Sequence, residues 1–308
     1  VLSQYGDWRW VFGINVPIGV AVLALVGLVL PGGQRQRAAR LDLVGIGGVT
    51  LGLAAVVYGL TEAPEIGADP LRAVLPLVLG AGLLAVVFRR ERRLTDPLLP
   101  AELLAVREVR GANLVAAAVT ASTTPAMYLA VLYLQNIVGL PPGQAALYFP
   151  VLNLAVIVGS FLGPKLIALF AARLTAAGGF LLIVAGCVVL TALPAVGLPT
   201  ALLLTAFASM GVGLGLASTA STTVGTDAAP ASHRGTVSGL LNAAAQIGTA
   251  LGLALVVPMV AATTAAGPPD PAGMRYGFAA AGVIAAAGLA VSTLLGARRK
   301  ATTRAGAD

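Results

Sequence analysis

Long apolar runs recur along the chain, and they constrain its fold more than any other feature. Each run holds about 20 residues with few charges, which is long enough to cross about 30 Å of hydrocarbon as a helix. Hydrocarbon offers no partner for exposed backbone groups, so each run must be helical, and the strand alternation of a barrel is absent. We therefore predict an all-α polytopic membrane protein with nine transmembrane helices. The predicted spans are 10–30, 41–61, 71–88, 111–138, 146–169, 174–196, 200–224, 236–262 and 275–296.

The composition argues against a soluble domain. Hydrophobic residues make up 58% of the chain and charged residues 10%, with a mean hydropathy of +0.93. A soluble domain is about 25% charged and needs an amphipathic outer layer. The net charge of +7 comes from loops beside the apolar runs, where it indicates topology and not a nucleic-acid-binding surface. We expect the lipid bilayer as a partner, and no nucleic acid.

The basic residues also predict an orientation. Of the 19 Lys and Arg residues, all but Arg9, Arg72 and Arg275 lie in or beside one set of alternate loops. Cytoplasmic loops carry the excess of basic residues, so this set is predicted to be cytoplasmic. The chain would then be a multi-pass protein of the cell (inner) membrane with a cytoplasmic C-terminus. Its first residue would lie outside, which implies an odd number of upstream spans and a longer parent protein. The basic set comprises 31–40, 89–110, 170–173, 225–235 and the tail from 297.

The sequence offers no pattern for catalysis or metal binding. Cys187, the single cysteine, lies inside an apolar run and is expected to be a small buried hydrophobe. His233 is a solitary loop histidine. GVGLG at 211–215 matches a nucleotide loop only in composition, because it sits within a span and follows no strand. We expect no enzyme, no catalytic residue and no metal site.

Polar residues lie at the start of the first two apolar runs. The first run opens with DWRWVFGINVPIG at 7–19, and Asp42 lies at the start of the second run. Trp8, Arg9 and Trp10 suit the headgroup region. Pro17 is expected to kink the helix, and Asn15 could satisfy a carbonyl freed by that kink. At the start of its run, Asp42 is expected to cap a helix, with proton coupling as the lesser alternative.

Five stretches in order resemble the fourteen-span drug:proton antiporters of the major facilitator superfamily. The first contains Trp8, Arg9, Trp10, Asn15, Pro17 and Gly19, and the second contains Asp42 and Gly45. The resemblance covers the whole chain as spans six to fourteen. One departure is the loop GPKLIALFAAR, where Ala168 stands near the position of an acidic residue in the family pattern. The five stretches are DWRWVFGINVPIG (7–19), LDLVGIGGVTLGLAAVVYGL (41–60), DPLLPAELL (96–104), YLAVLYLQNIVGLPPGQAALYFP (128–150) and HRGTVSGLLNAAAQIGTALGLAL (233–255).

The resemblance implies a partial major-facilitator fold and a division of the chain. Residues 1–40 would be the last helix of a first lobe with a cytoplasmic linker, and 41–88 two linking helices. Residues 89–110 would be a cytoplasmic loop, with Leu103, Leu104 and Val106 in a short interfacial helix. Residues 111–296 would form the second six-helix lobe, and 297–308 a cytoplasmic tail.

Neutral polar and aromatic residues are the candidates for a substrate cavity. No Asp, Glu, Lys, Arg or His lies at the middle of the last six spans, so proton-carrying groups are expected upstream. Asn242 and Gln246 are four residues apart and share a helix face. Amides, aromatics and apolar walls suit an amphipathic, drug-like ligand, although interhelical hydrogen bonding is an alternative role. The candidates are Asn242, Gln246, Gln135, Asn153, Tyr128, Tyr133 and Thr124.

The resemblance implies a transporter that exports drug-like or amphipathic compounds by alternating access. It would use no cofactor, with the proton gradient as energy source. Its partners would be a small-molecule substrate, protons, lipid and the N-terminal lobe of the same protein. The alternatives are an uptake symporter of the superfamily, a membrane enzyme, and a non-transporting fragment or partner protein. Three GxxxG pairs are expected to pack helices closely. They are Gly48/Gly52, Gly211/Gly215 and Gly248/Gly252.

Overall fold

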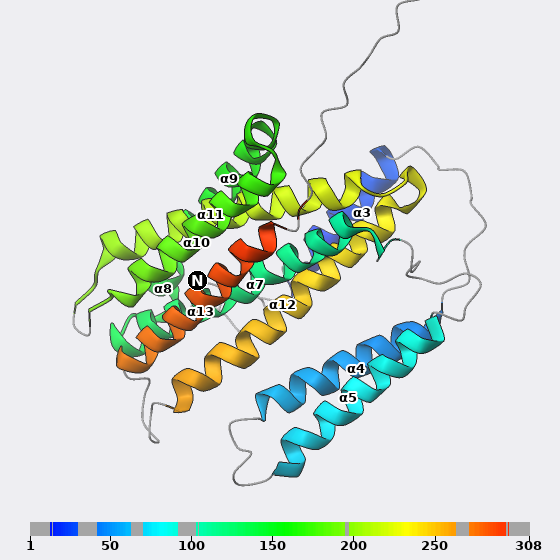
Figure 1. Ribbon diagram of the computed structural model, residues 1–308. Coiled ribbons are helices and arrows are strands. Elements are labelled where there is room, and N and C mark those ends of the chain that lie inside the picture. The colour runs from blue at the N-terminus through cyan, green and yellow to red at the C-terminus, as the bar shows by residue number, and fades with distance from the viewer. Residues whose placement is uncertain are drawn as a thin grey trace, which may run out of the picture.

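Nine long helices make up the part of the chain that the computed structural model describes (Figure 1). That part comprises residues 13, 15–29, 42–62, 70–91, 103, 105–194, 197–262, 271–293 and 295. The helices are α3 (Asn15–Val29), α4 (Leu43–Thr61), α5 (Pro70–Glu91), α7 (Arg107–Leu132), α9 (Phe149–Phe170), α10 (Ala172–Thr191), α11 (Thr200–Asp227), α12 (Arg234–Ala262) and α13 (Pro271–Ser292).

Each predicted span corresponds to one of these helices, so the predicted all-α polytopic fold is confirmed. Seven of the described helices are long and apolar enough to cross a membrane, and α3 and α4 contain shorter apolar segments. Three short elements were not predicted. They are a π-helical turn (Tyr133–Ile137) that extends α7, the helix α8 (Pro142–Ala146) and a 3₁₀ turn (Ala231–His233) before α12.

The last six long helices form one bundle with an internal repeat. The two three-helix units are α7, α9 and α10, and then α11, α12 and α13. Helix α9 of the first unit packs on α11 of the second, and α12 of the second packs on α7 of the first. Likewise α10 packs on α11 while α13 packs on α7, and the pair α9–α10 corresponds to the pair α12–α13. The packing pattern of α7, α9 and α10 therefore recurs in α11, α12 and α13. Nested three-helix repeats of this kind are typical of transporter lobes.

Glycines set how closely these helices approach. A Cβ atom built on Gly248 or Gly252 of α12 would overlap the carbonyl oxygen of Ala117 or Ala121 on α7. The other two GxxxG pairs behave alike: Gly211 and Gly215 lie against α9, and Gly48 and Gly52 lie against α5. All three pairs are thus at helix contacts, as predicted. Lipid provides no hydrophobic driving force for helix association. Close approach lets dispersion between the backbones stabilise these helix pairs instead.

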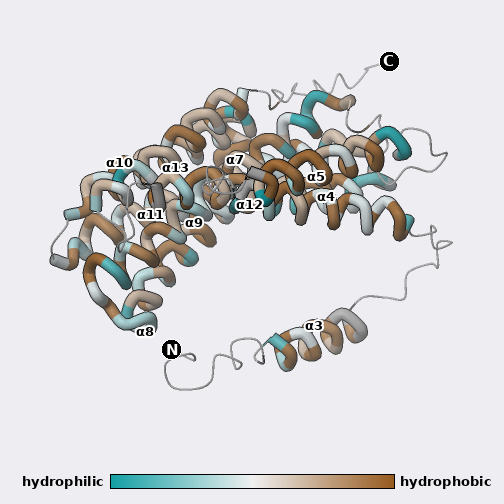
Figure 2. Tube along the Cα trace, turned by 90° about the horizontal axis from the view of Figure 1, so that it is seen from below, coloured by the Kyte–Doolittle hydropathy of each residue, from teal (hydrophilic) through white to brown (hydrophobic). Residues whose placement is uncertain are grey.

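The helices α4 and α5 form an antiparallel hairpin beside the bundle. They pack mainly on each other, and α4 also touches α12. Helix α3 lies apart from both, as the second view shows (Figure 2). Every described side chain of α3 is exposed, including Val16, Ile18, Leu23 and Leu28. These apolar side chains have no covering helix among the described residues.

The stretch before α7 corrects one expectation. Leu103 was expected to face lipid in an interfacial helix, but it is 8% exposed and belongs to the bundle core. Val106 is half-buried and also packs against this core, whereas Leu104 lies outside the described residues. Leu103 and Val106 thus contribute to the protein core just before α7, which begins at Arg107.

Candidate substrate-facing site

Helix α12 presents the polar stripe that the sequence predicts. Asn242 and Gln246 are both exposed, and Thr249 follows nearly one turn later. Another side of α12 carries Gly248 and Gly252 against α7. The exposed side chains of Asn242 and Gln246 lie outside this close backbone contact.

Gln246 and Tyr128 meet in one hollow of about 500 Å³. Tyr128 comes from α7 and is 44% exposed. Thr249 completes the polar lining, and the remaining walls are apolar. The apolar lining residues are Val57, Ala250, Leu253, Ala254, Val257 and Pro258.

The threonines beside the hollow join α7 to α12. The hydroxyls of Thr124 and Thr249 lie 3.4 Å apart and share a hydrogen bond. One turn earlier, the hydroxyl of Thr120 donates to the carbonyl of Ala245 at 2.5 Å. Thr124, a predicted cavity residue, therefore makes an interhelical contact next to the hollow.

The other predicted cavity residues lie elsewhere. Tyr133 is 2% exposed, and its hydroxyl donates to the carbonyl of Pro194 at 2.8 Å. In this conformation it is part of the core and presents no group to a ligand. Gln135 is half-buried in the π-helical turn, Asn153 is exposed on α9, and Asn242 lies one turn along α12 from Gln246. The structure thus brings Gln246 and Tyr128 together and leaves the others dispersed.

Chemically, this hollow offers one amide, one phenol ring and one threonine hydroxyl in an apolar surrounding. The amide can both donate and accept hydrogen bonds, and the phenol ring can also contact a cation. Such sites orient a mainly apolar ligand through a few polar groups. Val57 was missed by sequence analysis, since only tertiary structure places the α4–α5 hairpin beside α12.

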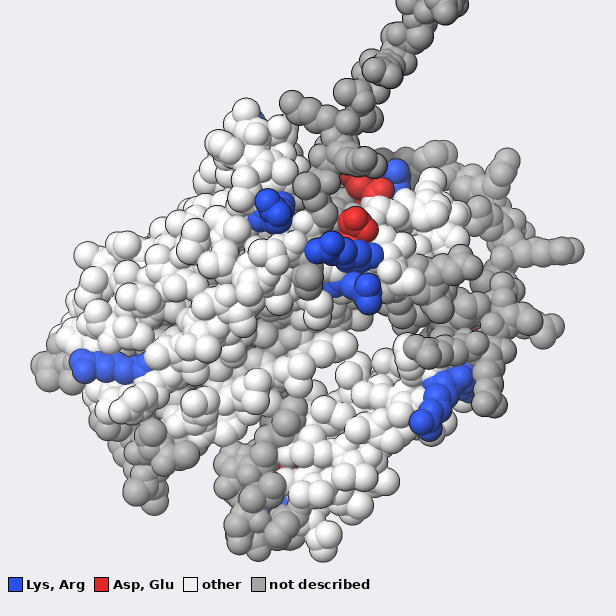
Figure 3. Space-filling model, viewed as in Figure 1, with Lys and Arg blue, Asp and Glu red and all other residues white. Residues whose placement is uncertain are grey.

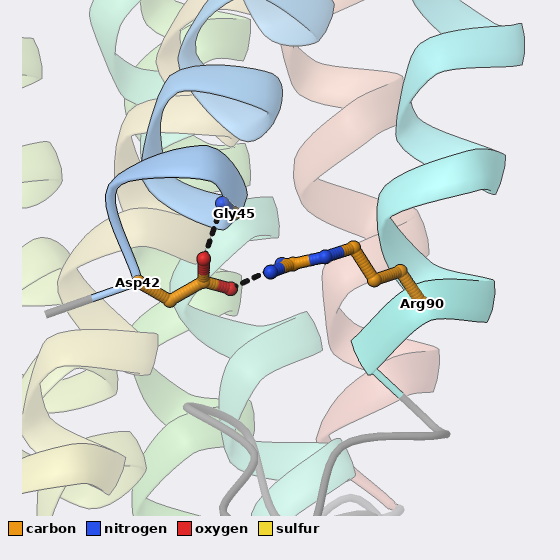
Figure 4. A network of polar contacts seen from close by, with 3 residues as sticks. All are labelled: Asp42, Gly45 and Arg90. Atoms are coloured by element: carbon orange, nitrogen blue, oxygen red, sulfur yellow. Dashed lines mark hydrogen bonds and ion pairs between the residues drawn. The ribbon is translucent and has the colours of Figure 1, made fainter. Parts of the chain in front are cut away.

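Asp42 caps α4 and ties the hairpin together (Figure 4). Its Oδ1 accepts a hydrogen bond from the backbone N–H of Gly45 at 3.0 Å, as expected of an N-cap. Its Oδ2 pairs with Nη1 of Arg90, in the last turn of α5, at 2.5 Å. The hydrogen bond from Arg90, followed by that from Gly45, lowers the pKa of Asp42 below its usual 3.8. The carboxylate is therefore ionised at neutral pH.

Part of the first motif can be located. Asn15, Pro17 and Gly19 are exposed on α3, and a Cβ atom at Gly19 would meet nothing within 4 Å. Trp8, Arg9 and Trp10 lie outside the described residues. The kink expected at Pro17 and the role expected of Asn15 stay predictions.

Basic side chains gather at one end of the helices, with few at the other (Figure 3). Arg89 and Arg90 end α5, while Arg107 and Arg234 begin α7 and α12. Cys187 is buried and free. The described residues contain no group of three or more His, Cys, Asp or Glu that could hold a metal ion.

Comparison with known proteins gives one family and several relatives. The family model described as Major Facilitator Superfamily matches residues 1–253. The puromycin resistance protein pur8 of Streptomyces alboniger is 35% identical over 273 residues, covering 86% of this chain and 53% of that protein. The cephamycin export protein CmcT of Amycolatopsis lactamdurans is 30% identical over 287 residues, covering 92% and 59%.

A third relative is the multidrug resistance protein Stp of Mycobacterium tuberculosis (strain ATCC 25618 / H37Rv). It is 29% identical over 264 residues, which cover 85% of this chain and 48% of that protein. The chain therefore spans about half the length of the curated relatives that it matches.

Proposed function

Because this chain belongs to the major facilitator superfamily, we propose that it forms the second part of a proton-driven exporter of drug-like, amphipathic compounds. The superfamily consists of transporters, so the expectation of a multi-pass membrane transporter and not an enzyme is confirmed at family level. Two relatives are named for drug resistance and one for export, which supports efflux over uptake.

The observation that carries the proposal is the hollow shared by Gln246 and Tyr128. Its polar groups are neutral and its walls are apolar. A ligand there would exchange water for apolar contact and be oriented by one amide and one phenol. The exposed Asn242 would extend the polar stripe toward the proposed cytoplasmic end of α12. In the proposed cycle a first lobe faces this surface, and rocking of the two lobes opens the cavity to alternate sides.

The proposed domain arrangement follows the same scheme. Helix α3 would belong to the first lobe, the α4–α5 hairpin would link the lobes, and α7 to α13 would be the second lobe. Helix α3 packs extensively on neither the hairpin nor the bundle, which supports its assignment to a different lobe. The basic helix ends support a cytoplasmic C-terminus in the inner membrane.

Protons would be carried by the first lobe. The six predicted spans of the second lobe hold no Asp, Glu, Lys, Arg or His at mid-depth, where a proton-carrying group would be expected. Asp42 is a poor carrier because its lowered pKa keeps it ionised at physiological pH, whereas a proton-transfer group works best with a pKa near the operating pH.

Ligand binding by the chain in nanodiscs tests the site. We expect Gln246→Ala to weaken binding of rhodamine 6G, measured by fluorescence polarisation, about fivefold, which corresponds to the loss of one hydrogen bond of about 1 kcal/mol. Gln144→Ala is the matched control, since Gln144 is exposed on α8 and does not line the hollow. Equal affinity of both variants for the dye would show that Gln246 does not contribute to the binding site.

Direction is tested in everted vesicles that hold the chain together with its proposed first lobe. Acidification of the lumen should drive rhodamine 6G into such vesicles, and a protonophore should stop this uptake. Dye that left the vesicles under the same gradient would indicate a symporter that works in the uptake direction and would overturn the proposal.

A further inference from the structure

A second hollow lies between the α4–α5 hairpin and α12, and the site described above does not use it. Its volume is about 870 Å³. Gly45, Val49 and Phe88 line it from the hairpin, and Gly239 and Ala243 line it from α12. The lining includes two threonines, Thr50 and Thr236, and Thr50 donates its hydroxyl to the carbonyl of Ile46 within the same helix, at 2.9 Å. An apolar chain is therefore the ligand chemistry that fits.

The hollow is short enough along α12 to lie within one leaflet of a bilayer. Its lining on α12 runs from Thr236 to Ala243, which rises about 10 Å along a helix. The hydrocarbon of one leaflet is about 15 Å deep. The smaller hollow follows on the same helix from Gln246 to Pro258. The larger hollow thus occupies the leaflet nearest the start of α12.

Two basic residues lie in the same helical turns as the end of this hollow that is nearest the start of α12. Arg89 directly follows the lining residue Phe88, and Arg234 lies two residues before the lining residue Thr236. Both arginines are exposed. The nearby carboxylate of Asp42 is paired with Arg90 and does not cancel this charge. A negatively charged headgroup would be attracted to this end of the seam.

We propose that the seam between the α4–α5 hairpin and α12 binds an anionic phospholipid, with an acyl chain in the hollow and the phosphate between Arg89 and Arg234. The lipid fills the space between the hairpin and α12, where the hairpin packs on α12 mainly through α4. The bound lipid stabilises the packing of the linking hairpin against the second lobe. This role is independent of the transported compound and of the direction of transport.

Native mass spectrometry of the chain tests the lipid, with phosphatidylglycerol and phosphatidylcholine of identical acyl chains as probes. Phosphatidylglycerol should remain bound where phosphatidylcholine is lost. Arg89→Gln and Arg234→Gln should each weaken the retained phosphatidylglycerol about fivefold, the effect of one basic residue at a membrane surface. Equal retention of both lipids by the unaltered chain would overturn the proposal.

Gly239→Leu tests the hollow itself. A Cβ atom at Gly239 meets nothing within 4 Å, so the leucine side chain can enter the hollow without displacing backbone. We expect this variant to lose bound phosphatidylglycerol. Gly82→Leu is the matched control: a Cβ atom there also meets open space, but Gly82 does not line the hollow. Loss of lipid from both variants, or from neither, would contradict the assignment.

A positional readout remains if Gly239→Leu fails to fold. A bimane label on Gly239→Cys reports on the hollow, because the native Cys187 is buried and escapes labelling. Brominated phosphatidylglycerol should quench this label more strongly than brominated phosphatidylcholine. Equal quenching by the two lipids would show a bulk-lipid surface. No quenching by either would show that protein, such as a segment of the first lobe, fills the seam.

Discussion

Asp42 joins two helices of the hairpin through a single carboxylate. One oxygen caps α4 and the other pairs with Arg90 at the end of α5. Sequence analysis predicted the cap, because an Asp immediately before an apolar run is a common helix start. The ion pair could not be predicted, since Arg90 lies 48 residues further along the chain and only the return of α5 brings it close.

The ion pair predicts a pH dependence. The pKa of Asp42 is lowered in the folded state, so its contribution to stability is present above the unfolded value of 3.8 and is lost as the pH falls through the lower folded value. We expect Asp42→Asn, which keeps a capping side chain, to lower the unfolding temperature in detergent at pH 7. The difference from the unaltered chain should shrink below pH 3.8. Arg90→Gln should show the same dependence; a difference that is undiminished at pH 3 would contradict the ion-pair account.

Ala171 is the one described non-glycine residue with a positive φ, at φ 71° and ψ 156°. It is the single residue between α9 and α10, in the loop that departs from the family pattern. This backbone region suits glycine, and a side chain there costs about 1–3 kcal/mol. We therefore expect Ala171→Gly to raise the free energy of unfolding by about 1 kcal/mol, measured by denaturant titration in detergent micelles.

The control for that substitution is its neighbour. Ala172 begins α10 and is 5% exposed, with ordinary helical geometry. Ala172→Gly should lower the free energy of unfolding, by up to about 1 kcal/mol. Stabilisation by both glycines would mean that relief of backbone strain at Ala171 is not the cause.

At the scale of helices, close backbone contact dominates over polar contact. The α7–α12 pair has glycines against carbonyls and also the hydrogen bond from Thr120 to Ala245. An interhelical hydrogen bond in a membrane contributes about 0.6 kcal/mol. Overpacking a tight interface costs about 1–3 kcal/mol. Substitutions at the glycines should therefore matter more than those at the threonine.

Gly248→Ala tests this ordering. The added methyl group would overlap the carbonyl of Ala117, so we expect a loss of about 2 kcal/mol in the free energy of unfolding. Gly235→Ala, on the same helix but with open space at its Cβ, should be neutral or slightly stabilising. Thr120→Val should lose about 0.6 kcal/mol. A Gly248→Ala variant as stable as Gly235→Ala would show that α7 and α12 separate easily.

At the scale of the whole molecule, the described residues form a six-helix bundle, a helical hairpin and a separate helix, which we propose to be one lobe, a linker and a helix of a first lobe. Alternating access needs two bodies that rock about a cavity. We therefore expect this chain alone to give no proton-driven export of rhodamine 6G in liposomes, although it should bind the dye. Export at a rate above protein-free liposomes would contradict the two-lobe requirement. Absence of binding would instead weaken the proposed site.

The amino-acid sequence determined the helices, because a run of about 20 apolar residues has few structures available in hydrocarbon. It also indicated the glycine contacts, since spacing of four places small residues on one helix face. It identified Gln246 and Tyr128 as polar groups within apolar spans.

Only the tertiary structure decided which candidate residues meet. Side chains such as Tyr133 and Tyr128 are five residues apart on successive turns, yet one is buried and the other is exposed, because neighbouring helices cover one side of α7. The same holds for Leu103, whose apolar character suits lipid and core equally. Helix identity is a local property of the chain, whereas burial depends on partners that are distant in sequence.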